Sequence, residues 1–136
     1  LAISLHAATD ETRGVLVPGS PAGRVQELVD AAAWYTRRTG RESTLEYVLI
    51  RGANDQLEHA DALASAIDGR EIHVNLIPLN PVKHRPELKP PSGMTGLAFA
   101  KRLQSQGVTC TLRTQRGEDI NAACGQLALE RSLVDG

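Results

Sequence analysis

The sequence lacks several features that would each place it in a familiar class of protein. It has no long apolar run that could cross a membrane, and its start does not have the layout of a signal peptide. Its two cysteines, Cys110 and Cys124, make neither a disulfide framework nor a metal-ligand cluster. It also has no excess of one charge, with 15 Lys and Arg against 16 Asp and Glu. These absences argue against a membrane protein and mildly against a stand-alone RNA-binding module.

The remaining composition fits an ordinary globular domain. The 136 residues suffice for one domain with a buried core, and the cysteine usage leads us to expect a reducing, cytoplasmic setting. The sequence opens at Leu1, inside an apolar run and without a Met. We therefore expect it to be a piece of a longer protein.

Alternating apolar patterns predict an α/β fold with the order β-α-β-α-β-α-β. Strands are predicted over residues 1–5, 43–50, 71–78 and 108–113, and helices over about 21–38, 55–68 and 94–106. Strands separated by helices favour a parallel sheet. The apolar run at residues 1–5 predicts a strand buried on both faces, followed by a polar stretch over residues 9–13.

Capping residues set the expected helix boundaries. Ser20 is a good N-cap with Pro21 behind it, and Gly40 is expected to end the same helix. Ser92 is expected to cap the last helix. Asp55 with Glu58 three residues on resembles a capping box for the helix that begins there and runs to about residue 68.

A single cysteine near the C-terminus stands in an unusual setting. Cys124 lies between Ala123 and Gly125, so other groups can approach its sulfur closely. The pattern leaves two readings, a working thiol or a small residue used in packing. We expect Cys124 on a mobile, partly exposed segment and Cys110 inert in the core.

Polar residues follow the ends of two predicted strands. Ser4 and His6 are expected on one side of the first strand, because strand side chains alternate. Spacing alone favours a polar pair at a strand end, while a ligand site at the C-terminal mouth of the sheet is the alternative. Asn75 and Asn80 flank a proline-punctuated strand end, as turn residues or as amides that bind a ligand.

Two further polar residues, Glu46 and His59, each allow a structural and a functional interpretation. Glu46, inside an apolar strand, is either on an exposed face or reaches into a barrel interior. His59 lies beside acidic residues on the outer face of a predicted helix, and we interpret it as solvated. No residue set at metal-ligand spacing accompanies it, so the chain itself is expected to hold no metal.

Three motifs together resemble a known family. The segment 117–127, Gly-Glu-Asp-Ile-Asn-Ala-Ala-Cys-Gly-Gln-Leu, resembles the C-terminal signature of the radical-SAM adenine methyltransferases of rRNA and tRNA. The run Asn-Leu-Ile-Pro-x-Asn-Pro at 75–81 and the triplet Ser-Leu-His at 4–6 resemble two further segments of that family. The resemblance extends over nearly the whole chain.

The resemblance implies a fold and a set of cofactor residues. It implies the later half of a partial (β/α) radical-SAM barrel over residues 1–113, and a methyl-carrier cysteine segment over residues 114–136. Ser4, Leu5, His6 and Asn80 would contact S-adenosylmethionine, and Cys124 would be catalytic. The 4Fe–4S cluster of the family needs a three-cysteine loop, which this sequence does not contain. The isolated chain is therefore expected to be inactive.

The resemblance also implies a reaction. In the intact enzyme, Cys124 would be methylated by one S-adenosylmethionine, and a radical derived from a second would activate that methyl group for addition to adenine. A second cysteine would then release the RNA by forming a disulfide. The expected product is adenine methylated at carbon 2 in 23S rRNA and tRNA, with no membrane or stable protein partner implied.

Three alternatives remain open at this point. The family also contains enzymes that methylate carbon 8 of adenine. A non-catalytic α/β domain, perhaps one that binds RNA, is a second possibility. An ordinary half-barrel enzyme that uses Ser4, His6 and Asn80 to bind a phosphate or a cofactor is the third.

Overall fold

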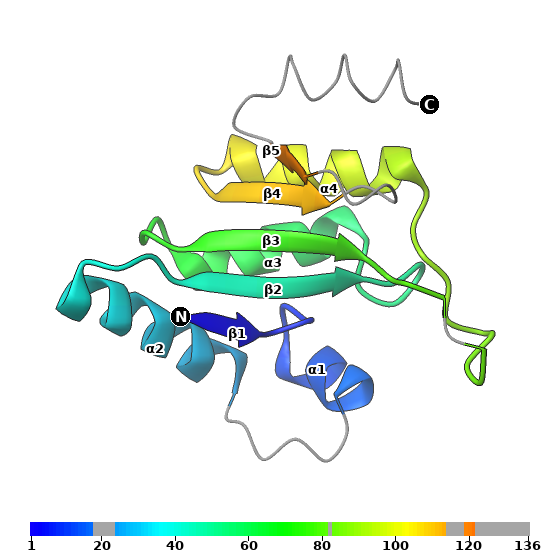
Figure 1. The fold of residues 1–136 in the computed structure, drawn as a ribbon, viewed down its shortest axis with the longest axis horizontal. Coiled ribbons are helices and arrows are strands. Elements are labelled where there is room, and N and C mark those ends of the chain that lie inside the picture. Colours follow the sequence, from blue (N-terminus) through cyan, green and yellow to red (C-terminus); the bar gives the residue numbers. More distant parts are fainter. Residues whose placement is uncertain (18–23, 82, 114–118, 122–136) are drawn as a thin grey trace.

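The computed structural model describes residues 1–17, 24–81, 83–113 and 119–121, and within them the chain forms one five-stranded sheet (Figure 1). The spatial order of the strands is the order of the sequence, from β1 to β5. The first four strands are parallel and β5 is antiparallel to β4. The strands are β1 (Ala2–Ser4), β2 (Thr44–Leu49), β3 (His73–Pro78), β4 (Thr109–Arg113) and β5 (Asp119–Asn121). The predicted parallel α/β fold is therefore confirmed.

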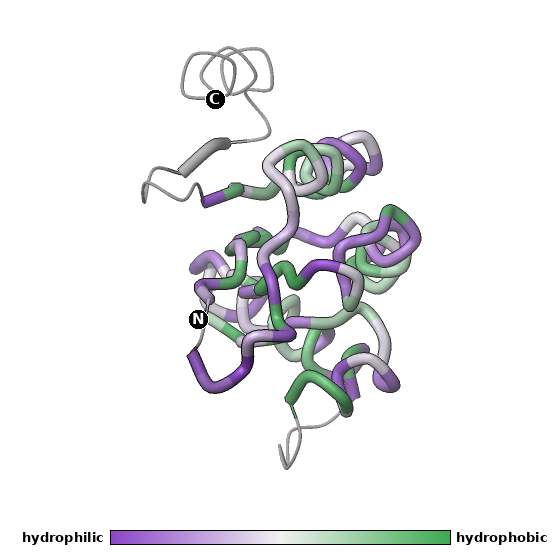
Figure 2. Tube along the Cα trace, turned by 90° about the vertical axis from the view of Figure 1, so that its right-hand side faces the viewer, coloured by the Kyte–Doolittle hydropathy of each residue, from purple (hydrophilic) through white to green (hydrophobic). Residues whose placement is uncertain are grey.

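Helices cover one face of this sheet. They are α2 (Val25–Thr39), α3 (Leu57–Ile67) and α4 (Gly93–Ser105), whereas the short helix α1 (Asp10–Leu16) lies at the end of β1. Figure 2, turned by 90°, shows α3 and α4 on the same side of the strands. The apolar faces of α2, α3 and α4 join the inward side chains of β2, β3 and β4 in one core.

The opposite face of the sheet is not covered by any helix of the described residues. In β2 the side chains of Leu45, Tyr47 and Leu49 are buried, whereas Thr44, Glu46 and Val48 alternate with them and stay half-exposed. Strand β1 shows the same asymmetry, with Ala2 and Ser4 exposed. The prediction that the first strand is buried on both faces is therefore wrong, because no helix of the described residues covers the face that carries Ala2 and Ser4.

Several predicted helix ends are confirmed. The Ser92 side chain accepts a hydrogen bond from Thr95 N and caps α4, and Gly40 closes α2 with a φ of 72°. The predicted Ser20 cap and Pro21 lie outside the described residues. Asp55 does not cap α3, because its carboxylate accepts a hydrogen bond from Gly52 N instead.

Two elements were missed by the sequence interpretation. Residues 9–13 are not a mere polar stretch, since Thr9 caps the short helix α1, whose first turn carries Asp10 and Glu11. The antiparallel strand β5 lies within the segment that we expected to be a cysteine loop. The residues that it pairs with are near in sequence, since Asp119 lies opposite Arg113 and Asn121 opposite Thr111, but a strand of three residues is too short to show a clear alternating pattern.

Candidate functional site at the carboxyl edge of the sheet

The carboxyl end of β1 is held by a buried arginine. Arg13 of α1 is 8% exposed, and its guanidinium donates to Leu5 O at 3.1 Å and to Ser4 O at 3.3 Å. Both Leu5 N and His6 N donate to the carbonyl oxygen of Glu46. Helix α1 therefore folds back on the Ser4–His6 segment and fixes its backbone.

The alternation argument requires His6 to continue the first strand, but in the structure it does not. The strand ends at Ser4, and His6 takes a left-handed φ of 61°. Its Nδ1 accepts a hydrogen bond from Val48 N at 3.0 Å, so the imidazole takes the place of the next strand residue beside β2. Strand periodicity therefore cannot place Ser4 and His6 on one side of the sheet, and the argument from alternation is wrong.

The charge state of His6 follows from its surroundings. Burial lowers the pKa of His6 below its usual 6.5, and the nearby Arg13 lowers this pKa further, whereas Glu46 raises it. A backbone N–H can only donate, so Nδ1 carries no proton and the ring is neutral. The remaining proton is on Nε2.

Asn54 joins the ends of β1 and β2. This side chain is fully buried, and its Nδ2 donates to His6 O at 2.9 Å and to Val48 O at 2.7 Å. Its Oδ1 accepts from Ile50 N at 2.8 Å. Sequence reasoning missed Asn54, because an asparagine in a Gly-Ala-Asn-Asp loop looks like ordinary turn chemistry.

A row of polar side chains crosses the uncovered face of the sheet. Strand register places Ser4 beside Glu46, Glu46 beside Asn75 and Asn75 beside Thr111. Glu46 is half-buried there, on the face that would line a barrel interior. Asn75 Oδ1 is buried and has no hydrogen-bond partner among the described residues. The row therefore contains one buried acceptor, Asn75 Oδ1, that no other described residue binds.

Asn80 lies at the same edge of the sheet as His6. It is exposed and follows the end of β3, where Leu79 N donates to Leu49 O. Because β1, β2 and β3 are parallel, their carboxyl ends lie on one edge, with β2 between His6 and Asn80. Binding roles for Ser4, Leu5, His6 and Asn80 stay predictions.

The two cysteines can be compared only in part. Cys110 is fully buried, its thiol donates to Ala100 O at 3.5 Å, and burial raises its pKa to about 12. The interpretation of Cys110 as a core residue is confirmed. Cys124 lies outside the described residues, so its expected exposure stays a prediction.

His59 differs from its interpretation as a solvated residue. It is half-buried, and its Nδ1 is buried with no hydrogen-bond partner in the described part of the chain. No group of three or more His, Cys, Asp or Glu residues suited to a metal ion occurs among the described residues. Within the same residues, no helix is long and apolar enough to cross a membrane.

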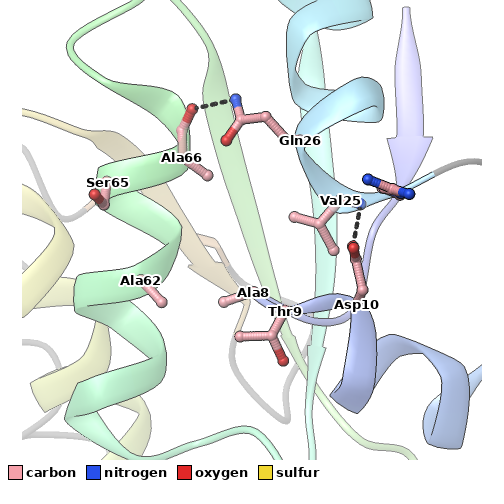
Figure 3. A pocket seen from close by; sticks show the side chains of 9 residues that line it. Ala8, Thr9, Asp10, Val25, Gln26, Ala62, Ser65 and Ala66 are labelled. Atoms are coloured by element: carbon pink, nitrogen blue, oxygen red, sulfur yellow. Dashed lines mark hydrogen bonds between the residues drawn. The ribbon is translucent and has the colours of Figure 1, made fainter.

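A pocket of about 480 Å³ lies on the helix side of the sheet (Figure 3). The starts of α1 and α2 and the second half of α3 line it, and Asp10 Oδ1 accepts a hydrogen bond from Val25 N at 2.7 Å. That contact caps α2, whose own N-cap residue makes no side-chain bond. None of the residues predicted to bind a cofactor lines this pocket.

Sequence comparisons identify close relatives. No family model matches the chain. Over 126 residues, or 93% of the chain, it is 48% identical to the probable dual-specificity RNA methyltransferase RlmN of Bacillus mycoides. It is 46% identical over the same length to the protein of that name from Bacillus subtilis. The chain spans about a third of the length of these relatives, since each alignment covers 34% of the relative.

Structural comparisons agree with the sequence comparisons. A radical SAM methyltransferase from Sphaerobacter thermophilus superposes with a TM-score of 0.76 at 43% identity, over 86% of this chain and 34% of that one. A domain of a pyruvate-formate lyase-activating enzyme from Bacteroides vulgatus superposes with a TM-score of 0.65 at 16% identity, over 82% and 65%. The second likeness shows the fold alone. The chain spans about a third of the length of these relatives, and it belongs to the family of radical SAM RNA methyltransferases.

Proposed function

We propose that this chain is part of a radical SAM enzyme that methylates carbon 2 of an adenine in 23S rRNA and in tRNA. The observation that carries the proposal is the identity of 46–48% to RlmN proteins across 93% of the chain. The name of these relatives, dual-specificity RNA methyltransferase, is the reason for proposing two kinds of RNA. Residues 1–113 would supply part of the barrel, and residues 114–136 the methyl-carrier segment.

The residues at the carboxyl edge fit S-adenosylmethionine. This cofactor supplies the methyl group, and it carries a carboxylate, an amine and hydroxyl groups that need polar partners. His6 keeps an Nε2–H for donation, and Ser4 and Asn80 are exposed at or near the same edge. Asn75 Oδ1 adds an acceptor without a partner among the described residues. We propose that Ser4, His6 and Asn80 hold the cofactor through these groups.

Leu5 would contribute differently. Its side chain is fully buried, and its backbone N–H and carbonyl are already bonded to Glu46 and Arg13. We propose that Leu5 anchors the segment to the core and so fixes the spacing of Ser4 and His6. The side chains on either side of it would make the polar contacts.

The iron–sulfur cluster does not fit the residues of this chain. The whole sequence contains two cysteines, fewer than the three thiolates of the family's cluster loop. We propose that the cluster ligands belong to a part of the enzyme outside these 136 residues. This chain's own contribution is then the cofactor-binding edge and the carrier thiol.

The proposed role of Cys124 is to carry the methyl group. Its thiolate would displace the methyl group from the sulfonium sulfur, so that one S–C bond forms while another breaks and the thioether product leaves. The step requires a deprotonated thiol at neutral pH. Cys110, with a pKa of about 12, remains protonated under these conditions and is unsuited to the role.

A grafted enzyme tests the proposal. We define it as the Bacillus subtilis relative in which this chain replaces the matching third. Methylation of 23S rRNA and tRNA fragments is expected, with 2-methyladenosine found by mass spectrometry of the nucleosides. Cys124→Ala should abolish the product, and the control Cys110→Ala should retain most of it. Methylation at a normal rate in the Cys124→Ala enzyme would refute the proposal, and a product methylated at carbon 8 would correct the position.

A further inference from the structure

His6 has a backbone conformation that needs support. Its φ of 61° lies in the left-handed region, which non-glycine residues occupy at a cost in free energy. Histidine, like asparagine, enters this region more readily than most residues do, but the position still has to be stabilised by its neighbours. What holds His6 therefore determines how its ring is presented at the carboxyl edge.

Three hydrogen bonds from β2 and the loop after it hold His6 in place. Its N–H donates to Glu46 O at 3.2 Å and its ring Nδ1 accepts from Val48 N at 3.0 Å. Its carbonyl oxygen accepts from Asn54 Nδ2 at 2.9 Å. Asn54 is the one side chain in this set, and it lies 48 residues away in the sequence.

Both N–H groups of the Asn54 side-chain amide are engaged in hydrogen bonds. One N–H binds His6 O, the other binds Val48 O, and its Oδ1 accepts from Ile50 N. Tyr47 adds a fourth contact by donating its hydroxyl to Asn54 O at 2.8 Å. The Asn54 side chain thus links His6 to the end of β2, where Val48 N–H also donates to the imidazole ring.

These contacts determine the proton position on His6. Protonation of Nδ1 would remove its bond with Val48 N and leave a partly buried donor unpaired. Of the charged groups near the ring, Glu46 on β2 favours protonation, whereas Arg13 on α1 and burial oppose it. The neutral Nε2–H form can donate a hydrogen bond to an oxygen of a ligand, such as a carboxylate or a hydroxyl.

We propose that Asn54 is a positioning residue that holds His6 in its left-handed conformation, with Nδ1 on Val48 N and Nε2–H free to bind an acceptor oxygen of the ligand. The proposal rests on the proposed function for the identity of that ligand, S-adenosylmethionine. The part that concerns the conformation and proton position of His6 can be tested without any ligand.

The first test uses the grafted enzyme labelled with ¹⁵N-histidine, with the His6 signals assigned by their loss in a His6→Gln variant. At neutral pH the long-range ¹H–¹⁵N spectrum is expected to show an unprotonated Nδ1 and a protonated Nε2. A protonated Nδ1 in the unchanged protein overturns the proposal. This measurement needs no Asn54 variant, so the proposed proton position of His6 can be refuted even if every substitution at Asn54 prevents folding.

The second test replaces the donor and keeps the shape. Asn54→Asp retains an acceptor for Ile50 N but puts an oxygen where the N–H groups face His6 O and Val48 O. We expect the single His6 tautomer to be lost and the KM for S-adenosylmethionine to rise roughly tenfold, with a smaller change in kcat. The control Tyr47→Phe removes only the contact to the Asn54 backbone and should leave both quantities nearly unchanged.

The outcomes separate this proposal from the proposed function. A folded Asn54→Asp enzyme that keeps the His6 tautomer and the KM overturns the role of Asn54. If the grafted enzyme fails to bind S-adenosylmethionine although His6 shows the expected tautomer, the proposed function fails. In that case the tautomer in the Asn54→Asp protein still decides for or against the positioning role.

Discussion

The two faces of the sheet differ although the same strands build both. On the face under the helices, the side chains of Leu45, Tyr47 and Leu76 are completely buried. On the uncovered face, their neighbours Glu46 and Asn75 are polar and half-buried. The first face meets the requirement for a core, and the second keeps polar groups available for binding. Stability and ligand binding can therefore be tested separately by changing adjacent residues.

The largest expected difference concerns the reactivity of Cys110 on the covered face. With a pKa of about 12, only about one thiol in ten thousand is deprotonated at pH 8, compared with about one in four for an ordinary cysteine. Iodoacetamide should therefore alkylate Cys110 at least a thousandfold more slowly in the native protein than in denaturant, as measured by peptide mass spectrometry. Cys124 is expected to react first, and faster labelling of Cys110 than of Cys124 would contradict this contrast.

Adjacent residues of β3 allow a matched test of stability. Leu76 is fully buried under the helices, whereas Ile77 is half-exposed on the uncovered face. Leu76→Ala should reduce the free energy of unfolding by about 2–5 kcal/mol, because it leaves a cavity in the core. Ile77→Ala should cost about 1 kcal/mol. Urea unfolding of both variants in the grafted enzyme measures the difference, and equal losses would mean that the uncovered face is as tightly packed as the core.

The smallest expected effect concerns the charge of Glu46. Glu46 raises the pKa of His6, so Glu46→Gln should lower that pKa further below 6.5. Exposed Glu42 on the same chain segment is the control, since Glu42→Gln leaves the surroundings of His6 unchanged. NMR titration of the His6 ring measures both variants. An upward shift in the Glu46→Gln protein would contradict the proposed charge arrangement.

The same pKa has a consequence for stability. Because the pKa of His6 is lower in the folded than in the unfolded state, its contribution to stability is complete above pH 6.5. That contribution declines as the pH falls from 6.5 through the folded pKa. In Glu46→Gln this decline should extend to lower pH, which unfolding experiments across the acid range can follow.

The sequence predicted the parts of the fold that depend on local patterns. Local sequence determines three of these features: the alternation in β2 and β3, the apolar face of α2 and the Ser92 cap. The burial of Cys110 was also predicted, because it lies in mid-strand among apolar and β-branched residues. Helix α1 could have been found from Thr9 with Asp10 and Glu11 behind it, which is a capping pattern.

Features that depend on distant partners could not be predicted. Asp55 is a local exception, since it looked like a helix cap but its carboxylate accepts a hydrogen bond from Gly52 N, a neighbour in the preceding turn. His6 leaves the strand pattern because Val48 and Asn54, more than forty residues away, offer it other partners. Sequence motifs predict that Ser4, His6 and Asn80 belong to one site, whereas the hydrogen bond from Asn54 to His6 is visible only in three dimensions.

The most direct test of the account is the chemical state of the two cysteines in active enzyme. The grafted enzyme, isolated after turnover with S-adenosylmethionine, should yield a Cys124 peptide heavier by one methylene group, whereas the Cys110 peptide should be unmodified. In Asn80→Ala enzyme the methylated fraction should fall, because the cofactor is held less well. A methyl group on Cys110, or sustained RNA methylation with Cys124 never modified, would contradict the assignment of Cys124 as the methyl carrier.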